Sequence, residues 1–482
     1  MKTDNGYVFY DTETTGTVKG YDQILQIAAI RTNGDLDVID HEKAAFDLRC
    51  RRLSYQVPSP SALLVTDLEP DDLERAPLSH YELVRAVHTK FAEWSPSIFC
   101  GFNSIRFDEM MLRQAFFQTL HPIYQTQIEG NRRADALVMA RSAAIHAPHA
   151  LQFDAGHSFR LRDLARTNGI AIGTNDAHDA MADTRATLQL MRLIRDRAPS
   201  IFAQMMQNSD KAAVLAFAKQ TPVFRWSGVF GPYRLSECVT YVGSPEGDPN
   251  ALLFFNLAYD PEKFFRLSEH ELEEFMFGRV KPFRIARANS FPILMPLETP
   301  VAGLATKSIG ESILQQRAEA IARNLPFRKR VLQILQSRSQ DRPQATFVED
   351  RIYEGFISDR DTGRCAKFHE IPWEQRPALI RWFQDPRLRE LAARLIFVER
   401  PDVLPDELRK EITAWQMARI EADIDVPWLS APAAVAELQR MWGSSDPATR
   451  EKLERYAAFI GRIRSVATQK PHVIKKPRVI KK

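Results

Sequence analysis

The first two hundred residues alternate between short apolar runs and longer stretches in which apolar residues recur every three or four positions. Residues 7–10 are four consecutive apolar or aromatic residues between polar ones, and residues 24–30 form a similar run. Both runs predict short buried strands. The Asn33-Gly34 dipeptide is a strong hairpin turn, so we expect a third strand at residues 35–39. The three strands would form an antiparallel meander.

Helix signals follow the meander. Ser79 and Glu82 have the spacing of a capping box, and the residues up to 94 continue with helical periodicity. Residues 98–100 predict another short buried strand. A helix is expected to begin at Asp108, whose carboxylate the positive end of the helix dipole would favour.

Two more helices are expected before residue 199. The first has Ser158 as its N-cap and Gly169 at its C-terminal end, which would put Phe159 and Arg160 in the first turn. Free backbone amides beside an arginine suit a phosphate group, although an exposed arginine without a ligand fits the pattern equally well. The second helix has Asp179 as its N-cap.

His178 and Asp183 flank the start of this second helix. They are five residues apart, which is about 140° beyond one full helical turn, so they cannot share a helix face. We therefore expect His178 in the loop before the helix and Asp183 in the second turn.

The pattern changes twice in the remaining chain. Beyond about residue 199 it consists of short apolar and β-like runs, and beyond about residue 349 it is helical. Residues 280–289 alternate basic and apolar side chains, which predicts a strand with one basic face for a phosphate backbone or, equally, an ordinary half-buried strand. The β-like runs include 228–231, 238–242 and 252–257, and the helical runs are 378–383, 388–395, 405–420, 433–442 and 446–466.

Composition limits the class of protein. The 482 residues, 44% of them hydrophobic, suit a globular protein of about two to four domains. Six of the 65 Lys and Arg lie in residues 470–482, which leaves 59 basic against 61 acidic side chains elsewhere, so any phosphate-binding surface must be local. The tail at 468–482 is predicted to be a disordered basic arm that adds salt-sensitive affinity for DNA.

Cysteine usage and hydropathy point to the cytoplasm. The four cysteines are scattered without a CxxC pair, which argues against a disulfide framework and a zinc site. The sequence contains no apolar segment that predicts a membrane span or a signal peptide.

Asp11 and Glu13 are the first candidates for chemistry. Side chains two apart on an extended chain point to the same face, so both carboxylates would project together at the end of the first strand. Their mutual repulsion raises the pKa of one of them unless a cation lies between them, and hard oxygen ligands suit Mg²⁺ or Mn²⁺. An isolated pair of this kind is most often a surface turn with two solvated acids.

Two further motifs accompany this pair. Residues 103–108 contain Asn, Phe and Asp in the order NxxxFD, and His178 and Asp183 form HxxxxD. The series DxE, NxxxFD and HxxxxD resembles the DEDDh exonucleases, a branch of the DnaQ-like superfamily with an RNase H-like fold. In that family four carboxylates bind two metal ions and the histidine is the general base.

The resemblance implies a role for each motif residue. Asp11, Glu13 and Asp183 would bind the metal, Asp108 would act directly or through water, and His178, with a free pKa near 6.5, would accept the proton of the attacking water. Two Mg²⁺ ions, or Mn²⁺ in their place, would activate that water and stabilise charge on the reacting oxygens. The substrate contacts that we assign are Glu13, Asn103, Arg113, Tyr124, Arg141, Phe159 and Arg160.

Over its whole length the chain resembles the bacterial exonuclease I family. The resemblance is carried by the SFRL segment before HxxxxD, the NSFPILMP segment after the basic strand, and RIYEGFISD at residues 351–359. It implies a DEDDh exonuclease domain at 1–198, an SH3-like β-containing domain at 199–345, and a helical domain at 349–467. In that family the three domains form a clamp that degrades single-stranded DNA processively from 3′ to 5′, releasing 5′-mononucleotides.

The resemblance also implies partners. Single-stranded DNA would be the substrate, in DNA repair, and the C-terminal peptide of single-stranded-DNA-binding protein would be a partner of a monomeric enzyme without membrane contact. Two alternatives remain open at this point. The substrate could be RNA, or the chain could be a nucleic-acid-binding clamp with a vestigial nuclease site, although all five catalytic positions are filled.

Overall fold

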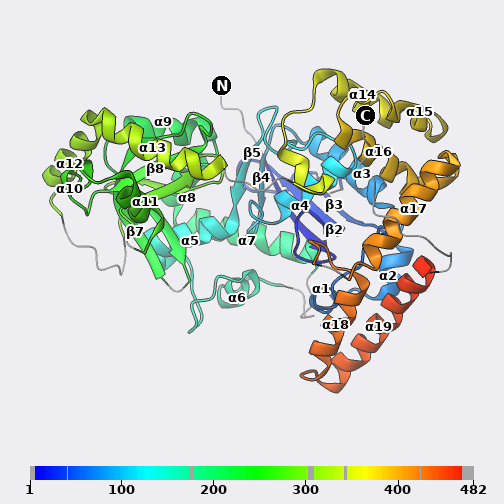
Figure 1. Ribbon diagram of the computed structural model, residues 1–482. Coiled ribbons are helices and arrows are strands. Elements are labelled where there is room, and N and C mark those ends of the chain that lie inside the picture. The colour runs from blue at the N-terminus through cyan, green and yellow to red at the C-terminus, as the bar shows by residue number, and fades with distance from the viewer. Residues whose placement is uncertain are drawn as a thin grey trace.

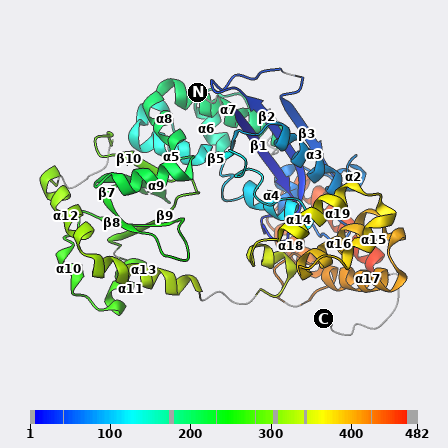
Figure 2. The ribbon, with the colours of Figure 1, turned by 90° about the horizontal axis from the view of Figure 1, so that it is seen from above.

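The computed structural model describes residues 6–40, 42–172, 179–231, 233–279, 281–301, 309–340, 345–423 and 425–468. These residues form two five-stranded sheets with surrounding helices, followed by a helical region (Figure 1). Seen from above, the second sheet lies to one side of the first sheet and the C-terminal helices lie to the other, so that the three parts form a C (Figure 2). Residues 469–482 of the basic tail lie outside the described residues.

The first sheet has the strand order β3-β2-β1-β4-β5. Strand β1 pairs antiparallel with β2 and parallel with β4, and β4 pairs parallel with β5. The α/β exonuclease fold and the three-stranded meander are thereby confirmed. The strands are β1 (Tyr7–Thr14), β2 (Ile24–Thr32), β3 (Ala45–Arg49), β4 (Ile98–Gly101) and β5 (Arg132–Asp135).

Helices cover both faces of this sheet because the side chains of β1 alternate between the faces. Tyr7 and Phe9 belong to a core with α5, α7 and α8, whereas Val8 and Tyr10 belong to a core with α3 and α4. The capping box of α3 is confirmed, and so is the start of α4 at Asp108. The helices here are α1 (Pro60–Thr66), α2 (Pro70–Arg75), α3 (His80–Glu93), α4 (Asp108–Gln118), α5 (Ala136–His146), η1 (Pro148–Ala150), α6 (Leu161–Thr167), α7 (Ala180–Arg197) and α8 (Pro199–Gln207).

The third strand does not lie where we expected it. It occupies Ala45–Arg49 instead of residues 35–39, because the side chain of Asn33 accepts hydrogen bonds from the backbone N–H groups of Asp35 and Asp37 (2.9 and 2.8 Å). Leu36 inside this turn has a φ of 61°. The turn at Asn33-Gly34 is confirmed, but several further residues follow it before the chain extends into β3.

The start of α6 also differs from the prediction. Arg160 is the N-cap residue, and Ser158 and Phe159 precede the helix. The hydroxyl of Ser158 donates to the side chain of Asp163 (2.7 Å) and accepts from the N–H of Arg160 (3.2 Å), so it stabilises the approach to the helix from outside it. The predicted end is confirmed, since Gly169 follows the helix with a φ of 71°.

The second sheet is antiparallel throughout, in the order β10-β6-β7-β8-β9. Strand β8, between β7 and β9, is buried on both faces, with Leu253 and Phe255 toward α11 to α13 and Leu252 and Phe254 toward α9. The SH3-like description of this region stays a prediction. The elements are α9 (Lys211–Gln220), β6 (Phe224–Phe230), β7 (Tyr233–Gly243), β8 (Ala251–Asn256), α10 (Glu262–Phe265), α11 (Glu269–Phe277), β9 (Phe283–Arg287), β10 (Ile293–Pro296), α12 (Glu311–Arg323) and α13 (Leu325–Gln340).

The predicted basic face of β9 is wrong. Arg284 and Arg287 are three residues apart, so they cannot lie on the same face of a strand. Arg284 pairs with Glu237 (2.6 Å) and lies over the ring of Trp226, while Arg287 pairs with Asp248 (2.9 Å). Neighbouring residues of the same sheet region therefore neutralise the charge of this strand.

The C-terminal region is helical, as predicted, and α14 adds one helix that the sequence reading missed. Its helices pack in two clusters that both include residues from the first part of the chain. Tyr81 and Phe117 join one cluster, and Leu25, Val57 and Leu63 join the other. The elements are η2 (Val348–Tyr353), α14 (Asp359–Glu370), η3 (Trp373–Gln375), α15 (Arg376–Ile380), α16 (Pro386–Glu399), η4 (Pro401–Val403), α17 (Asp406–Ile420), α18 (Ala431–Trp442) and α19 (Pro447–Thr468).

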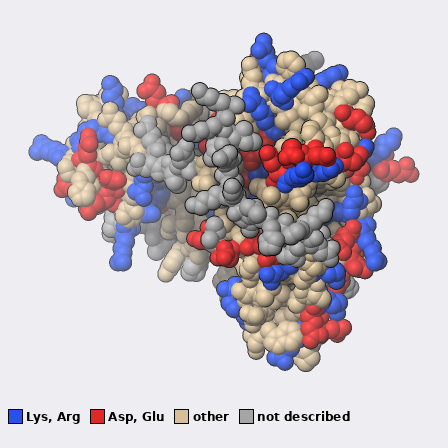
Figure 3. Space-filling model, turned by 45° about the vertical axis from the view of Figure 1, so that its right-hand side comes forward, with Lys and Arg blue, Asp and Glu red and all other residues tan. Residues whose placement is uncertain are grey.

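The surface agrees with the nearly balanced charge of the sequence. On the face in Figure 3, Lys and Arg are interspersed with Asp and Glu and do not form one continuous basic area. Among the described helices, none has the length and apolar content needed to cross a membrane.

Candidate active site

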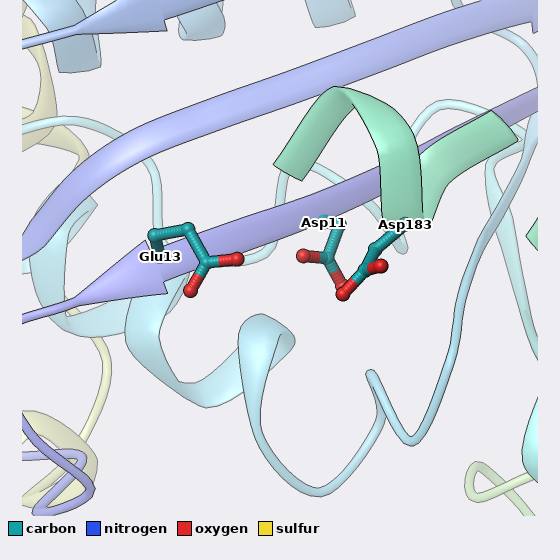
Figure 4. A group of neighbouring side chains, drawn as sticks. All are labelled: Asp11, Glu13 and Asp183. Carbon is teal, nitrogen blue, oxygen red and sulfur yellow. The ribbon is translucent and has the colours of Figure 1, made fainter. Parts of the chain in front are cut away.

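Three carboxylates meet beside strand β1. The strand is longer than expected and runs to Thr14, so Asp11 and Glu13 lie within it. They continue the alternation of Tyr7 and Phe9 and therefore face α7, which contributes Asp183. One carboxylate oxygen from each of Asp11, Glu13 and Asp183 lies within 4.8 Å of the other two (Figure 4). The sequence prediction that these three residues come together is confirmed.

The pKa values of Asp11 and Glu13 are raised first by burial and then by repulsion between the carboxylates. Burial raises the pKa of Glu13 to about 8, with the carboxylates of Asp183 and Asp108 adding to the shift. Burial and the same neighbours, together with Glu13, raise the pKa of Asp11 well above its ordinary range. Three close carboxylates with oxygen ligands only are a donor set that suits a hard divalent cation, which would relieve the repulsion. The cluster therefore fits a divalent metal site.

Asp108 approaches the cluster from the other side of β1. It lies at the first position of α4, is 3% exposed, and accepts hydrogen bonds from the N–H and the hydroxyl of Thr12 (3.1 and 2.6 Å). Burial raises its pKa to about 6, although the Thr12 hydrogen bonds act in the opposite direction. Asp108 does not belong to the group of three close carboxylates among the described residues. Sequence reasoning missed Thr12, although its position between Asp11 and Glu13 was a signal that could have identified it.

The start of α7 is held against the sheet. Asp179 is its N-cap, as predicted, and accepts from the N–H of Ala182 (3.0 Å). The same side chain accepts from Gln26 (3.1 Å) and pairs with Arg49 (3.0 Å). These contacts fix the helix end, so that Asp183 lies in its first turn and not in the second as expected. His178, the predicted general base, lies outside the described residues.

Asn103 lies in the loop between β4 and α4. Its φ is 62°, and its backbone N–H donates to the side chain of Asp135 (3.0 Å). Asp135 ends β5 and caps α5, and the sequence reading did not single it out. An aspartate directly before a run with helical periodicity is an N-cap signal that could have drawn attention to it.

Arg113 and Tyr124 belong to a buried network around Glu109. Arg113 donates to Glu109 (3.1 Å) and lies over the ring of Tyr124 at 5.2 Å. Glu109 is 1% exposed and also pairs with Arg133 (3.3 Å) and accepts from Thr126 (2.7 Å). The structure gives Arg113 an internal partner, and its role as a substrate contact stays a prediction.

Arg141 and Phe159 lie together at the side of the first sheet that meets the second. The Arg141 guanidinium is 5.8 Å from the centroid of the Phe159 ring, and Arg234 of β7 approaches the same ring at 5.9 Å. Arg160 is exposed next to them in sequence. Within the described residues no carboxylate forms an ion pair with any of these three arginines.

Comparison with known proteins covers both ends of the chain. Residues 8–191 match the family described as Exonuclease, and residues 346–463 match the Exonuclease I C-terminal domain. Exodeoxyribonuclease I of Haemophilus influenzae is 27% identical over 413 residues, which are 81% of this chain and 85% of that protein.

Solved structures share the fold. Escherichia coli exonuclease I in complex with a dA16 oligonucleotide has a TM-score of 0.83 at 23% identity, covering 95% of this chain and 100% of that one. A structure described as SSB/exonuclease I in complex with an inhibitor has a TM-score of 0.80 at 22% identity, covering 96% and 100%. The two family matches and the curated relative show that the chain is similar to exonuclease I over most of its length, with an exonuclease domain followed by an exonuclease I C-terminal domain.

Proposed function

We propose that this chain is a 3′ to 5′ exonuclease that degrades single-stranded DNA to 5′-mononucleotides. The observation that carries the proposal is the cluster of Asp11, Glu13 and Asp183 in an exonuclease fold. The homologous exodeoxyribonucleases and the arrangement of the second sheet and the C-terminal helices on either side of the first sheet support it (Figure 2). An arrangement of this kind suits a DNA strand whose end reaches the cluster first and which is then cut processively.

Mg²⁺ is the metal that we assign to the cluster, as two ions, with Mn²⁺ able to replace it. Asp11, Glu13 and Asp183 would hold it, because their close oxygens repel one another without a cation. When bound, the metal lowers the pKa of a coordinated water and stabilises charge on phosphate oxygens.

The remaining roles belong to side chains around the cluster. His178 directly precedes the N-cap of α7 in sequence, and we assign it the proton of the attacking water. Asp108, held by Thr12, would orient groups at the cluster directly or through water. Arg141 and Arg160, with Phe159 beside them, would bind the phosphates and bases of the strand.

The first experiment uses a 5′-labelled single-stranded DNA oligomer with the full chain and Mg²⁺. We expect stepwise shortening from the 3′ end that EDTA and the Asp11→Asn variant both abolish. Asp71→Asn is the matched control, because Asp71 is an exposed side chain on α2, 63% accessible, that pairs with Arg75, and it should retain full activity. Binding without shortening would support a clamp instead of an enzyme.

The substrate is tested with matched DNA and RNA oligomers of the same sequence. We expect faster turnover of DNA, and preferential turnover of RNA would overturn the substrate assignment. A peptide with the C-terminal sequence of single-stranded-DNA-binding protein should bind the chain, since a solved relative is described together with that protein. The proposed state in solution is a monomer, which sedimentation would measure.

A further inference from the structure

The carboxylate of Asp135 makes more backbone contacts than a helix cap needs. It is 1% exposed and lies where β5 passes into α5. One oxygen, Oδ1, accepts from the N–H groups of Leu137 (3.0 Å) and Val138 (3.3 Å), which are the usual partners of an N-cap. Oδ1 also accepts from the N–H of Asn103 (3.0 Å), and Oδ2 accepts from the N–H of Ile105 (3.2 Å).

The loop that Asp135 holds leads directly to Asp108. Asn103 begins the turn with a φ of 62°, a conformation that favours glycine and costs free energy for other residues, although asparagine tolerates it best. Ser104 then closes the turn, because its backbone oxygen accepts from the N–H groups of Phe107 (3.2 Å) and Glu109 (2.9 Å). The side chain of Ser104 accepts from the N–H of Gly101 at the end of β4 (3.0 Å).

We propose that Asp135 is a positioning residue for the exonuclease reaction, which binds the amides of Asn103 and Ile105 and thereby fixes the turn that places Asp108 against Thr12. It touches neither substrate nor metal in this assignment. The inference rests on the proposed function, because it gives Asp108 its significance. It also explains why a carboxylate is present where an asparagine would cap the helix equally well.

Asp135→Asn separates the two tasks of this side chain. The amide oxygen can still accept from Leu137, Val138 and Asn103, so the helix cap survives and the contact that is lost is the one with Ile105. The amide nitrogen would replace Oδ2 opposite the N–H of Ile105, and two donors would then face each other. The loop is expected to shift while α5 stays in place.

The test measures kcat and KM on single-stranded DNA with Mg²⁺. We expect Asp135→Asn to lower kcat by about 10- to 100-fold, since small displacements of catalytic groups have effects of this size. The KM and the affinity for DNA in EDTA should change by a smaller factor than kcat, because among the assigned substrate contacts only Asn103 lies in the loop that shifts. Unchanged kcat would overturn the inference. A wild-type chain that does not shorten DNA would instead refute the proposed function.

Asp361→Asn is the matched control. Asp361 is also 1% exposed and also accepts from backbone N–H groups, those of Gln384 (3.0 Å) and Asp385 (2.8 Å), but it lies in the C-terminal helical region. It should lower thermal stability as Asp135→Asn does and leave kcat unchanged. Equal losses of kcat in both variants would mean that Asp135 has a structural role only.

Hydrogen exchange of the wild-type chain tests the proposal even if the Asp135→Asn variant does not fold. In the wild-type chain a peptide covering residues 102–106 should contain protected amides, although the segment is a loop, because Asn103 and Ile105 donate to a buried carboxylate. In Asp135→Asn the protection of the Ile105 amide should be lost while that of residues 137–146 is kept. Free exchange of the loop in the wild-type chain would contradict the proposal.

Discussion

Buried carboxylates occur in two settings in this molecule, and the settings have opposite electrostatics. In the C-terminal region Glu349 is 3% exposed and pairs with Arg394 (3.1 Å) and Arg419 (3.0 Å). In the exonuclease domain Asp11 and Glu13 lie beside further carboxylates, and burial and repulsion raise their pKa values. Glu349 is neutralised by the fold, whereas the cluster needs a cation from outside.

This difference separates structural from functional acids without reference to sequence motifs. A buried carboxylate between guanidinium groups fixes the chain around it, and loss of one partner leaves an uncompensated charge. A group of like charges destabilises the fold until a ligand binds, so it is expected at a functional site. Glu109, between Arg113 and Arg133, belongs with Glu349 although it directly follows Asp108.

The largest effect on activity should come from removing one carboxylate of the cluster. Asp11→Asn is expected to reduce exonuclease activity by at least about 10³-fold, comparable to the loss of an essential electrostatic group. Because the substitution removes one of several repelling charges, the free energy of unfolding in EDTA at pH 8 should rise by about 1 kcal/mol. Activity assays and urea denaturation measure the two quantities. A variant that is inactive and also less stable would show that Asp11 has a structural role as well.

Glu349→Gln should have the opposite effects, a large loss of stability and little change in activity. The change removes the ion-pair partner of the buried Arg419, while Arg394 keeps its ion pair with Glu390, so the free energy of unfolding should fall by about 3–5 kcal/mol. The kcat measured at low temperature, where the protein stays folded, should be close to that of the wild type. Urea denaturation at pH 7 is the measurement, and a loss below about 1 kcal/mol would contradict the view of Glu349 as a structural acid.

The pH dependence of stability tests the same difference between Glu349 and the cluster. The pKa of Glu13 is raised from its ordinary 4.5 to about 8, so folding favours its protonated form. The corresponding stability is complete below pH 4.5 and is lost as the pH rises through 8. In EDTA the melting temperature should therefore fall between pH 5 and pH 8.5 by more in the wild type than in Glu13→Gln. Mg²⁺ should restore it at pH 8.5, because the metal binds the ionised form.

The smallest effect is expected at an exposed pair. Arg49 and Asp179 are 46% and 40% exposed and lie 3.0 Å apart. Arg49→Ala should change the free energy of unfolding by less than about 1 kcal/mol, because solvent screens such pairs and Asp179 keeps its contacts with Ala182 and Gln26. Chemical denaturation in low and high salt would check this, and a loss near that of Glu349→Gln would mean that exposure does not decide the worth of an ion pair here.

The fold was predictable where local signals and burial agree. The α3 capping box at Ser79, the start of α4 at Asp108 and the buried run of β8 are all encoded within a few residues. The position of β3 was not, because the turn after Asn33 is stabilised by side-chain hydrogen bonds that a turn signal does not reveal. Arg284 and Arg287 on β9 are explained only by partners elsewhere in the chain, Glu237 on β7 and Asp248 in the loop between β7 and β8.

The site was predictable to a similar degree and for a similar reason. The alternation of β1 brings Asp11 and Glu13 to one face, and the helical motif supplies Asp183, so sequence spacing sufficed for the cluster. Thr12 and Asp135 act through backbone and hydroxyl contacts with residues about 30 to 100 positions away. Such long-range contacts leave no periodicity in the sequence.

The core that Leu25, Val57 and Leu63 share with residues between Ile420 and Ile463 has a consequence for synthesis. During translation the first sheet emerges early, but the helices that cover these side chains follow more than 350 residues later. The nascent chain therefore exposes this apolar surface until α18 and α19 have left the ribosome. This core cannot be complete before both helices are synthesised, and a chain truncated before α18 would leave Leu25, Val57 and Leu63 uncovered.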